Sequence, residues 1–241
     1  MKITANKANF GLAKVKFVPD HYVGLWQRTL FENSDGQDTT STVLWMQTYQ
    51  QHADIRIPAE RPDFSGCENL QECAPEQLRW LATQQGFLGY THVQNSVCEW
   101  RREIDFQPEN DTRDIADMVF DDESTLLETG IDTKYLERWK KLENSDSQSG
   151  LQITTGMNRH GETVTAYLLS AGDYLAYVRP RSVDVPNASD LLSAIDLYQP
   201  SHETLLDWLD MEISFGQLVE EQHWQVLHST LPFLEGNPRA K

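Results

Sequence analysis

The chain has 241 residues, and 37 acidic against 20 basic side chains give a formal net charge of −17 at pH 7. Such a surface repels phosphate backbones and anionic membranes, so we expect neither nucleic acid nor a membrane surface as a partner. There is no apolar run of roughly 18 residues and no apolar leader, so we expect no membrane span, no signal peptide and a cytoplasmic location.

The first half of the sequence predicts a meander of short strands. The segment 22–31 is aromatic and β-branched and ends near the turn signal Asp35-Gly36, and the segment 41–49 alternates between two faces. Further strands are expected at 53–57, 87–93, 97–106, 115–120 and 125–129, with one helix that begins at Pro75. Many short strands around one helix favour a closed barrel, because closure removes exposed sheet edges.

After Gly130 the pattern repeats. Tyr22 and Trp26 have counterparts in Tyr135 and Trp139, and each pair has the same four-residue spacing before an Asn-Ser-Asp turn. Internal similarity of this kind indicates duplication. We therefore divide the chain into an N-terminal barrel, residues 1–131, and a related C-terminal barrel, residues 132–241, with two short helices at 189–198 and 203–209. The alternative, that aromatic strands of any β protein share such spacing, stays open.

Gly24-Leu25-Trp26 resembles the G-x-W signature that opens lipocalins and related calycin barrels. Through residues 24–28, 54–58 and 100–106 the whole chain is also similar to a fungal family of casein-kinase interactors, which has bacterial relatives of unknown role. The resemblance implies an all-β fold of two tandem lipocalin-like antiparallel β-barrels with short helices in the connections, and it brings no catalytic residue. The second half departs from the signature, because Glu137 stands where the glycine would be.

No common catalytic or cofactor motif is present. The sequence lacks the G-x-S-x-G, H-E-x-x-H and G-x-G-x-x-G patterns and a phosphate-binding glycine loop. Cys67, Cys73 and Cys98 match no zinc spacing, and His223 and His228 would face opposite sides of a strand. We therefore predict no catalytic residue, no metal and no cofactor, and we favour a non-enzymatic protein.

Arg102 shares its face of the predicted strand with Trp100, so its guanidinium needs acceptors or an aromatic plane. In one interpretation Arg102 stacks on Trp26 and closes the barrel, as an arginine does in lipocalins. In another, Arg102 or Arg28 points into a cavity and binds a carboxylate or phosphate. A bulge would instead turn Arg102 to solvent. Arg56 lies between two isoleucines and is expected in solvent.

These residues define the ligand site that we expect in the N-terminal barrel. Its members are Trp26, Arg28, Trp45, Tyr49 and Arg102. The ligand would be a small molecule that is partly apolar or anionic. Two other roles stay open: a protein-interaction module that docks a partner through segments 61–74 and 196–210, and an enzyme that uses the barrel mouth.

Overall fold

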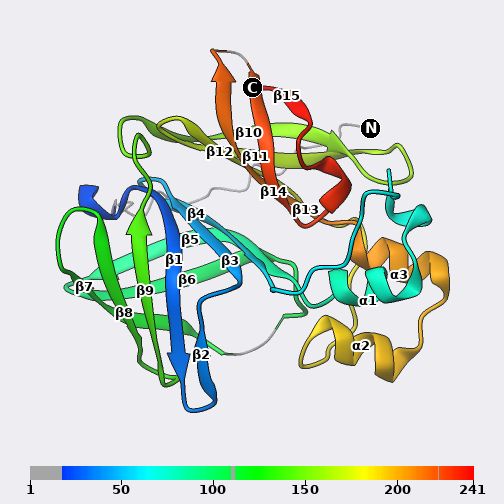
Figure 1. Ribbon diagram of the computed structural model, residues 1–241, viewed down its shortest axis with the longest axis horizontal. Helices are drawn as coiled ribbons and strands as arrows, with labels where there is room; N and C mark the ends of the chain where they lie inside the picture. Colours follow the sequence, from blue (N-terminus) through cyan, green and yellow to red (C-terminus); the bar gives the residue numbers. More distant parts are fainter. Residues whose placement is uncertain (1–17, 110–111, 222) are drawn as a thin grey trace, which may run out of the picture.

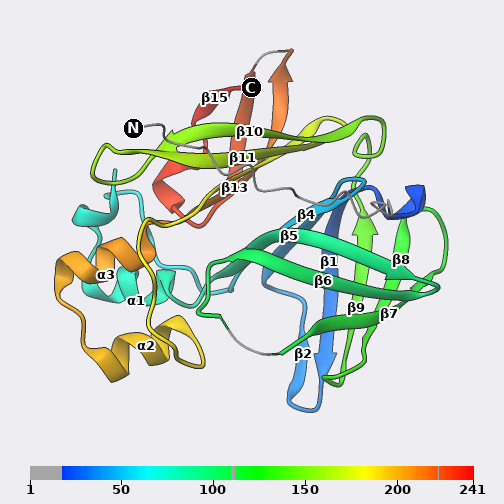
Figure 2. The same ribbon diagram turned by 180° about the vertical axis from the view of Figure 1, so that it is seen from behind.

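The structure, a computed structural model, describes residues 18–109, 112–221 and 223–241. In these residues the strands form two antiparallel sheets accompanied by three short α-helices (Figures 1 and 2). One sheet is a closed barrel and the other is a half-barrel. The predicted all-β fold class is confirmed.

Eight antiparallel strands form the closed barrel, because the last of them pairs with the first. In order around the barrel they are β1 (Gly24–Asn33), β3 (Thr42–Gln47), β4 (Gln51–Ile57), β5 (Gln85–Gln94), β6 (Val97–Asp105), β7 (Asp114–Phe120), β8 (Thr125–Gly130) and β9 (Tyr135–Lys141). A short strand, β2 (Gly36–Asp38), extends β1 as a hairpin, and the paired residues Asn33 and Gly36 flank its turn, as the Asp-Gly signal predicts. Closure leaves the eight barrel strands without a free edge.

Strand β9 corrects the sequence analysis. Segment 135–141 is predicted to open a second barrel as the counterpart of β1. The structure pairs it with β1 instead, from Trp26 opposite Lys141 to Asn33 opposite Tyr135, and with β8 on its other side. The prediction is wrong for this strand because an aromatic pattern does not specify the pairing partner. Trp26 and Trp139 therefore lie in one barrel, and the division into two domains stays a prediction.

Six strands form the second sheet. They are β10 (Ser149–Met157), β11 (Thr163–Ala171), β12 (Tyr174–Arg179), β13 (Glu212–Glu220), β14 (His223–Ser229) and β15 (Pro238–Ala240). Among the described strands, β10 and β15 each pair with one neighbour, so this sheet stays open as a half-barrel. Figures 1 and 2 show it lying across one side of the barrel.

Three helices cluster beside the barrel and below the half-barrel (Figure 1). They are α1 (Pro75–Leu81), α2 (Leu191–Tyr198) and α3 (His202–Leu209), and single 3₁₀ turns occur at η1 (Asp20–Tyr22), η2 (Leu70–Glu72) and η3 (Pro232–Leu234). The Asp190 side chain caps α2 by accepting from the Ser193 amide, and Ser201 caps α3 by accepting from the Thr204 amide. All three predicted helices are confirmed.

Two separate apolar cores meet at the barrel wall. One fills the barrel interior and contains the indoles of four tryptophans, Trp26, Trp45, Trp100 and Trp139. The other lies outside the wall, where Ile55 of β4 packs in one cluster with Phe215 of β13 and Leu206 of α3. Strands β3 and β4 are consequently buried on both faces. One face of each of these two strands packs in the outer core, so only the side chains on the other face point into the barrel.

Candidate functional site

The interior of the barrel has a closed end that is packed solid. The indoles of Trp26 and Trp45 stack with ring centroids 6.1 Å apart, and Trp139 contacts Trp45 edge to face at 5.9 Å. The void beside this packing measures about 10 Å³, which is near the minimum that holds one water molecule. Trp26 and Trp45, two residues of the expected ligand site, are buried core residues, and Trp45 borders this small void.

The cation over Trp26 is Lys141 of β9 and not Arg102. The Lys141 Nζ atom lies 4.9 Å from the ring centroid of Trp26 and donates a hydrogen bond to the carbonyl of His21. The interpretation that places Arg102 on Trp26 is therefore wrong. A sequence signal for Lys141 exists, because it follows Trp139 by two residues and shares its face of the strand.

The opposite end of the barrel is open and holds a cavity of about 810 Å³. Arg102 lies in its wall: its guanidinium carbon is 3.8 Å from the ring centroid of Phe87, and its nitrogens contact Asp105 at 2.9 Å and Asp114 at 2.6 Å. A β-bulge between Leu88 and Gly89 shifts the register beside it. Arg102 thus lines the cavity at an exposed position, and its binding of a carboxylate or phosphate stays a prediction.

Arg56 of β4 also points into the barrel, where the sequence predicts a solvent-exposed side chain. Its Nε atom lies 2.9 Å from a carboxylate oxygen of Asp54, and its guanidinium carbon lies 5.5 Å from the Phe87 ring centroid. The prediction is wrong because Ile55 and Ile57, its neighbours, pack in the core outside the wall. Arg56 is therefore left to line the cavity.

A pair of buried glutamates lies inside the barrel, where Glu137 lines the cavity and Glu128 lines the small void. Glu128 of β8 and Glu137 of β9 are directly opposite in the strand register. Glu128 accepts a hydrogen bond from the Tyr135 hydroxyl at 2.7 Å, and one oxygen of Glu137 accepts from Arg28 at 2.8 Å. The second oxygen of Glu137 is buried and has no hydrogen-bond partner among the described residues. Glu137 is also one of the residues that line the cavity, so this buried, unpartnered oxygen belongs to a side chain of the cavity wall.

The electrostatics of this pair favour a bound proton. Burial raises the pKa of Glu128 well above 4.5, and the opposing Glu137 raises it further. Burial also raises the pKa of Glu137, although Arg56 and Arg28 oppose the rise. Two carboxylates that face each other across a strand pair repel when both are ionised. We therefore expect Glu128 to keep its proton more readily than an exposed glutamate does.

Of the five expected ligand residues, only Arg102 lines the open cavity. Arg28 lies behind Glu137 and is held between that carboxylate and Asp38, 2.7 Å away. Tyr49 lies in the turn between β3 and β4 with 42% of its surface exposed. The sequence analysis missed the other charged and hydroxyl groups of the interior, which are Asp54, Arg56, Asp114, Glu128, Tyr135 and Glu137.

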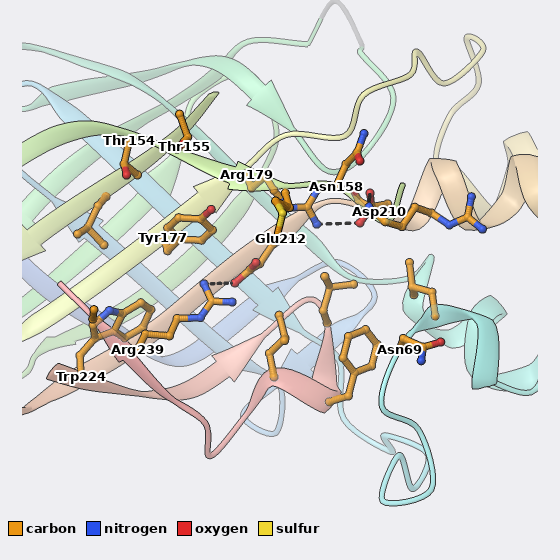
Figure 3. A pocket seen from close by; sticks show the side chains of 18 of the residues that line it. Asn69, Thr154, Thr155, Asn158, Tyr177, Arg179, Asp210, Glu212, Trp224 and Arg239 are labelled. Atoms are coloured by element: carbon orange, nitrogen blue, oxygen red, sulfur yellow. Dashed lines mark hydrogen bonds and ion pairs between the residues drawn. The ribbon is translucent and has the colours of Figure 1, made fainter. Parts of the chain in front are cut away.

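A second hollow lies on the concave face of the half-barrel and measures about 620 Å³ (Figure 3). Tyr177 and Trp224 lie in its wall, and two ion pairs cross it: Arg179 with Asp210 at 2.7 Å, and Arg239 with Glu212 at 2.6 Å. We call this hollow the half-barrel groove. The sequence analysis missed it because its residues come from segments that are distant in the chain.

In the segments expected to dock a protein partner, several apolar side chains point inward, whereas Leu197 and Tyr198 are exposed. Phe64 and Leu70, from segment 61–74, and Leu206 and Trp208, from segment 196–210, belong to the core outside the barrel wall. Cys67 and Cys73 in the first segment are free and buried, as is Cys98. The buried apolar residues of these segments thus contribute to the core, and docking of a partner through these segments stays a prediction.

Comparison of the chain with protein-family models, with curated proteins and with solved structures gives no match. Within the described residues, no helix is both long and apolar enough to cross a membrane. In the same residues, no group of three or more His, Cys, Asp and Glu side chains is arranged to hold a metal ion.

Proposed function

We propose that the chain is a binding protein whose barrel takes up a small polar molecule at its open end. The observation that carries the proposal is Glu137, a buried residue of the cavity wall with one carboxylate oxygen that has no hydrogen-bond partner among the described residues. A buried acceptor without a donor costs about 1–3 kcal/mol. A ligand N–H or O–H group that reaches this oxygen would remove that cost.

The arginines of the wall supply the second recognition element. Arg56 has a single carboxylate contact, with Asp54, and about a quarter of its side chain stays exposed. Burial raises the pKa of Asp54, which weakens the neutralisation of Arg56 when that carboxyl is protonated. A guanidinium in this position suits a carboxylate or phosphate. The ligand class is therefore a small molecule with an anionic group for Arg56 and a donor for Glu137.

The contrast between the two ends of the barrel supports a binding role. At the closed end the chain fills the interior with indole rings. At the open end it buries charged groups, which stabilise a fold no better than apolar side chains of similar volume. Folding alone therefore does not account for Glu128, Glu137, Arg56 and Arg102. Recognition of a charged or zwitterionic molecule does account for them.

Calorimetric titration with matched small molecules tests the proposal. The panel consists of free amino acids and, for each, the carboxylic acid and the amine that share its side chain. We expect at least one molecule with both groups to bind more tightly than either of its single-group analogues. Glu137→Gln and Arg56→Gln should each weaken binding about tenfold or more, since each removes a charge-assisted hydrogen bond.

Arg138→Gln is the matched control, because Arg138 follows Glu137 in β9 but points outward with 48% of its side chain exposed. This variant should bind as the unaltered protein does. The proposal fails if no panel member binds, or if a bound molecule is insensitive to both Glu137→Gln and Arg56→Gln.

A further inference from the structure

The half-barrel groove differs in character from the barrel cavity and lies in the other sheet. Its wall is largely apolar, with Leu168 of β11, Tyr177 of β12, Trp224 of β14 and Phe233 of η3 around one hollow (Figure 3). Leu168 is paired with Gln152 of β10 and with Tyr177, so these side chains share the concave face. The groove thus combines apolar side chains from β11, β12 and β14 in one wall.

Arginines outnumber carboxylates in this groove, although the chain as a whole is strongly acidic. The charged side chains of its wall, apart from the terminal Lys241, are Arg159, Arg179, Arg239, Asp210 and Glu212. Arg179 is nearly buried, and its guanidinium binds both the carboxylate and the carbonyl of Asp210. Its charge is therefore already satisfied within the protein.

Arg239 is the arginine that remains accessible. Its guanidinium lies over the rings of Tyr177 at 4.9 Å and Trp224 at 5.8 Å, and about a quarter of the side chain is exposed. Glu212 contacts its Nη1 atom and also accepts from the Ser214 hydroxyl at 2.6 Å, so part of the glutamate charge is shared with a second donor. The guanidinium is thus fixed at the boundary between apolar wall and solvent.

We propose that the half-barrel groove is a second binding site, which takes an amphipathic organic anion. The apolar body of such a molecule lies against Leu168, Tyr177 and Phe233, and its acidic group binds the exposed edge of Arg239. An anion with an apolar body gains from both parts of this wall, because burial of its apolar surface and a charge-assisted hydrogen bond act together. This inference is independent of the barrel cavity, which is lined chiefly by charged groups.

The openness of the half-barrel gives the ligand its access. The interior of the closed barrel contains four indoles. The half-barrel has two strands fewer, and its concave face holds the half-barrel groove. Gln152 and Thr154 of the edge strand β10 form the rim. A bulky side chain at Thr154 should therefore obstruct the groove without entering a packed core.

Isothermal titration with two probes of equal chain length and opposite charge tests the proposal. The probes are laurate and dodecyltrimethylammonium, both kept below micelle-forming concentrations. We expect one laurate to bind per chain and the ammonium compound to bind at least about tenfold more weakly. Arg239→Gln should remove most of this preference, and Thr154→Trp should weaken laurate binding.

Two control variants accompany the test. Arg79→Gln removes an exposed arginine on α1, and Thr165→Trp places the same indole at an exposed position on the face of β11 opposite to that of Leu168. Both should bind laurate as the unaltered chain does, and circular dichroism verifies that every variant is folded. The proposal is overturned if the two probes bind equally, if neither binds, or if Thr154→Trp and Thr165→Trp behave alike. Failure of amino-acid binding in the barrel would leave these results unaffected.

Discussion

The ammonium group of Lys141 lies over the indole of Trp26, and the two residues are also directly paired in the register between β9 and β1. One contact therefore joins the first and last strands of the barrel at its closed end. The Lys141 side chain is largely buried, and its ammonium is fixed by the carbonyl of His21. This geometry makes Lys141 a component of barrel closure.

Lys141→Gln should lower the free energy of unfolding by about 0.5–2 kcal/mol, the range of a partly desolvated cation–π contact. Urea titration followed by tryptophan fluorescence measures the change. Lys140→Gln is the control, because Lys140 is adjacent and exposed, and it should shift the free energy by less than about 0.5 kcal/mol. Equal effects of the two substitutions would argue against a closing role for Lys141.

The closing contact also shows how far the sequence predicts the fold. Turn signals, alternation and helix caps are local, so the hairpin at Asn33 and Gly36 and the three helices are predicted correctly. The partner of β9 depends on contacts more than a hundred residues apart along the chain, as between Trp26 and Lys141. A pattern of period two carries no information about that partner.

The site is less predictable than the fold because both faces of β4 are buried. Parity places Arg56 opposite Ile55, which is correct, but it does not tell which face is the barrel interior. The isoleucine face packs against the half-barrel and helices, a core whose existence follows from tertiary packing. For Arg102 the sequence leaves both an inward and a solvent-facing position open, and the structure places it in the cavity wall on the same face as the buried Trp100.

Arg102 should stabilise the open end of the barrel, since it joins Asp114 of β7 to β6 and covers the Phe87 ring. Arg102→Gln should lower the free energy of unfolding by about 1.5–3 kcal/mol, because it leaves two carboxylates without their cation. Arg101→Gln is the adjacent control: its side chain is 66% exposed and should contribute less than about 0.5 kcal/mol. Chemical denaturation measures the free energy of unfolding of both variants. A larger loss for Arg101→Gln than for Arg102→Gln would contradict the prediction.

Glu128 should make the protein less stable as the pH rises. Its pKa in the folded state lies above the ordinary 4.5, so above pH 4.5 the folded chain binds more protons than the unfolded chain. The free energy of unfolding therefore falls as pH increases from 4.5 towards the folded pKa. Glu128→Gln removes this term and keeps an acceptor for Tyr135.

Thermal unfolding of Glu128→Gln at several pH values measures this effect. The variant should gain stability relative to the unaltered chain between about pH 5 and pH 8. Glu32→Gln, at an exposed position on β1, is the control substitution. A difference between Glu128→Gln and the unaltered chain that stays constant across this range would show that Glu128 ionises as freely in the folded state as in the unfolded one.

His52 should have the opposite dependence on pH. The ring is fully buried, its Nδ1 atom lies 3.0 Å from the Thr91 hydroxyl, and burial lowers its pKa from 6.5 to about 3. Below pH 6.5 His52 binds a proton in the unfolded chain but stays neutral in the folded chain. The free energy of unfolding therefore decreases as the pH falls from 6.5 towards 3. His52→Gln cannot take up that proton and should lose less stability over this interval, which parallel urea titrations of the two proteins at pH 7 and pH 5 detect. If both proteins lose the same stability between these pH values, the folded chain protonates His52 as readily as the unfolded chain does, and the ring is not held neutral by its burial.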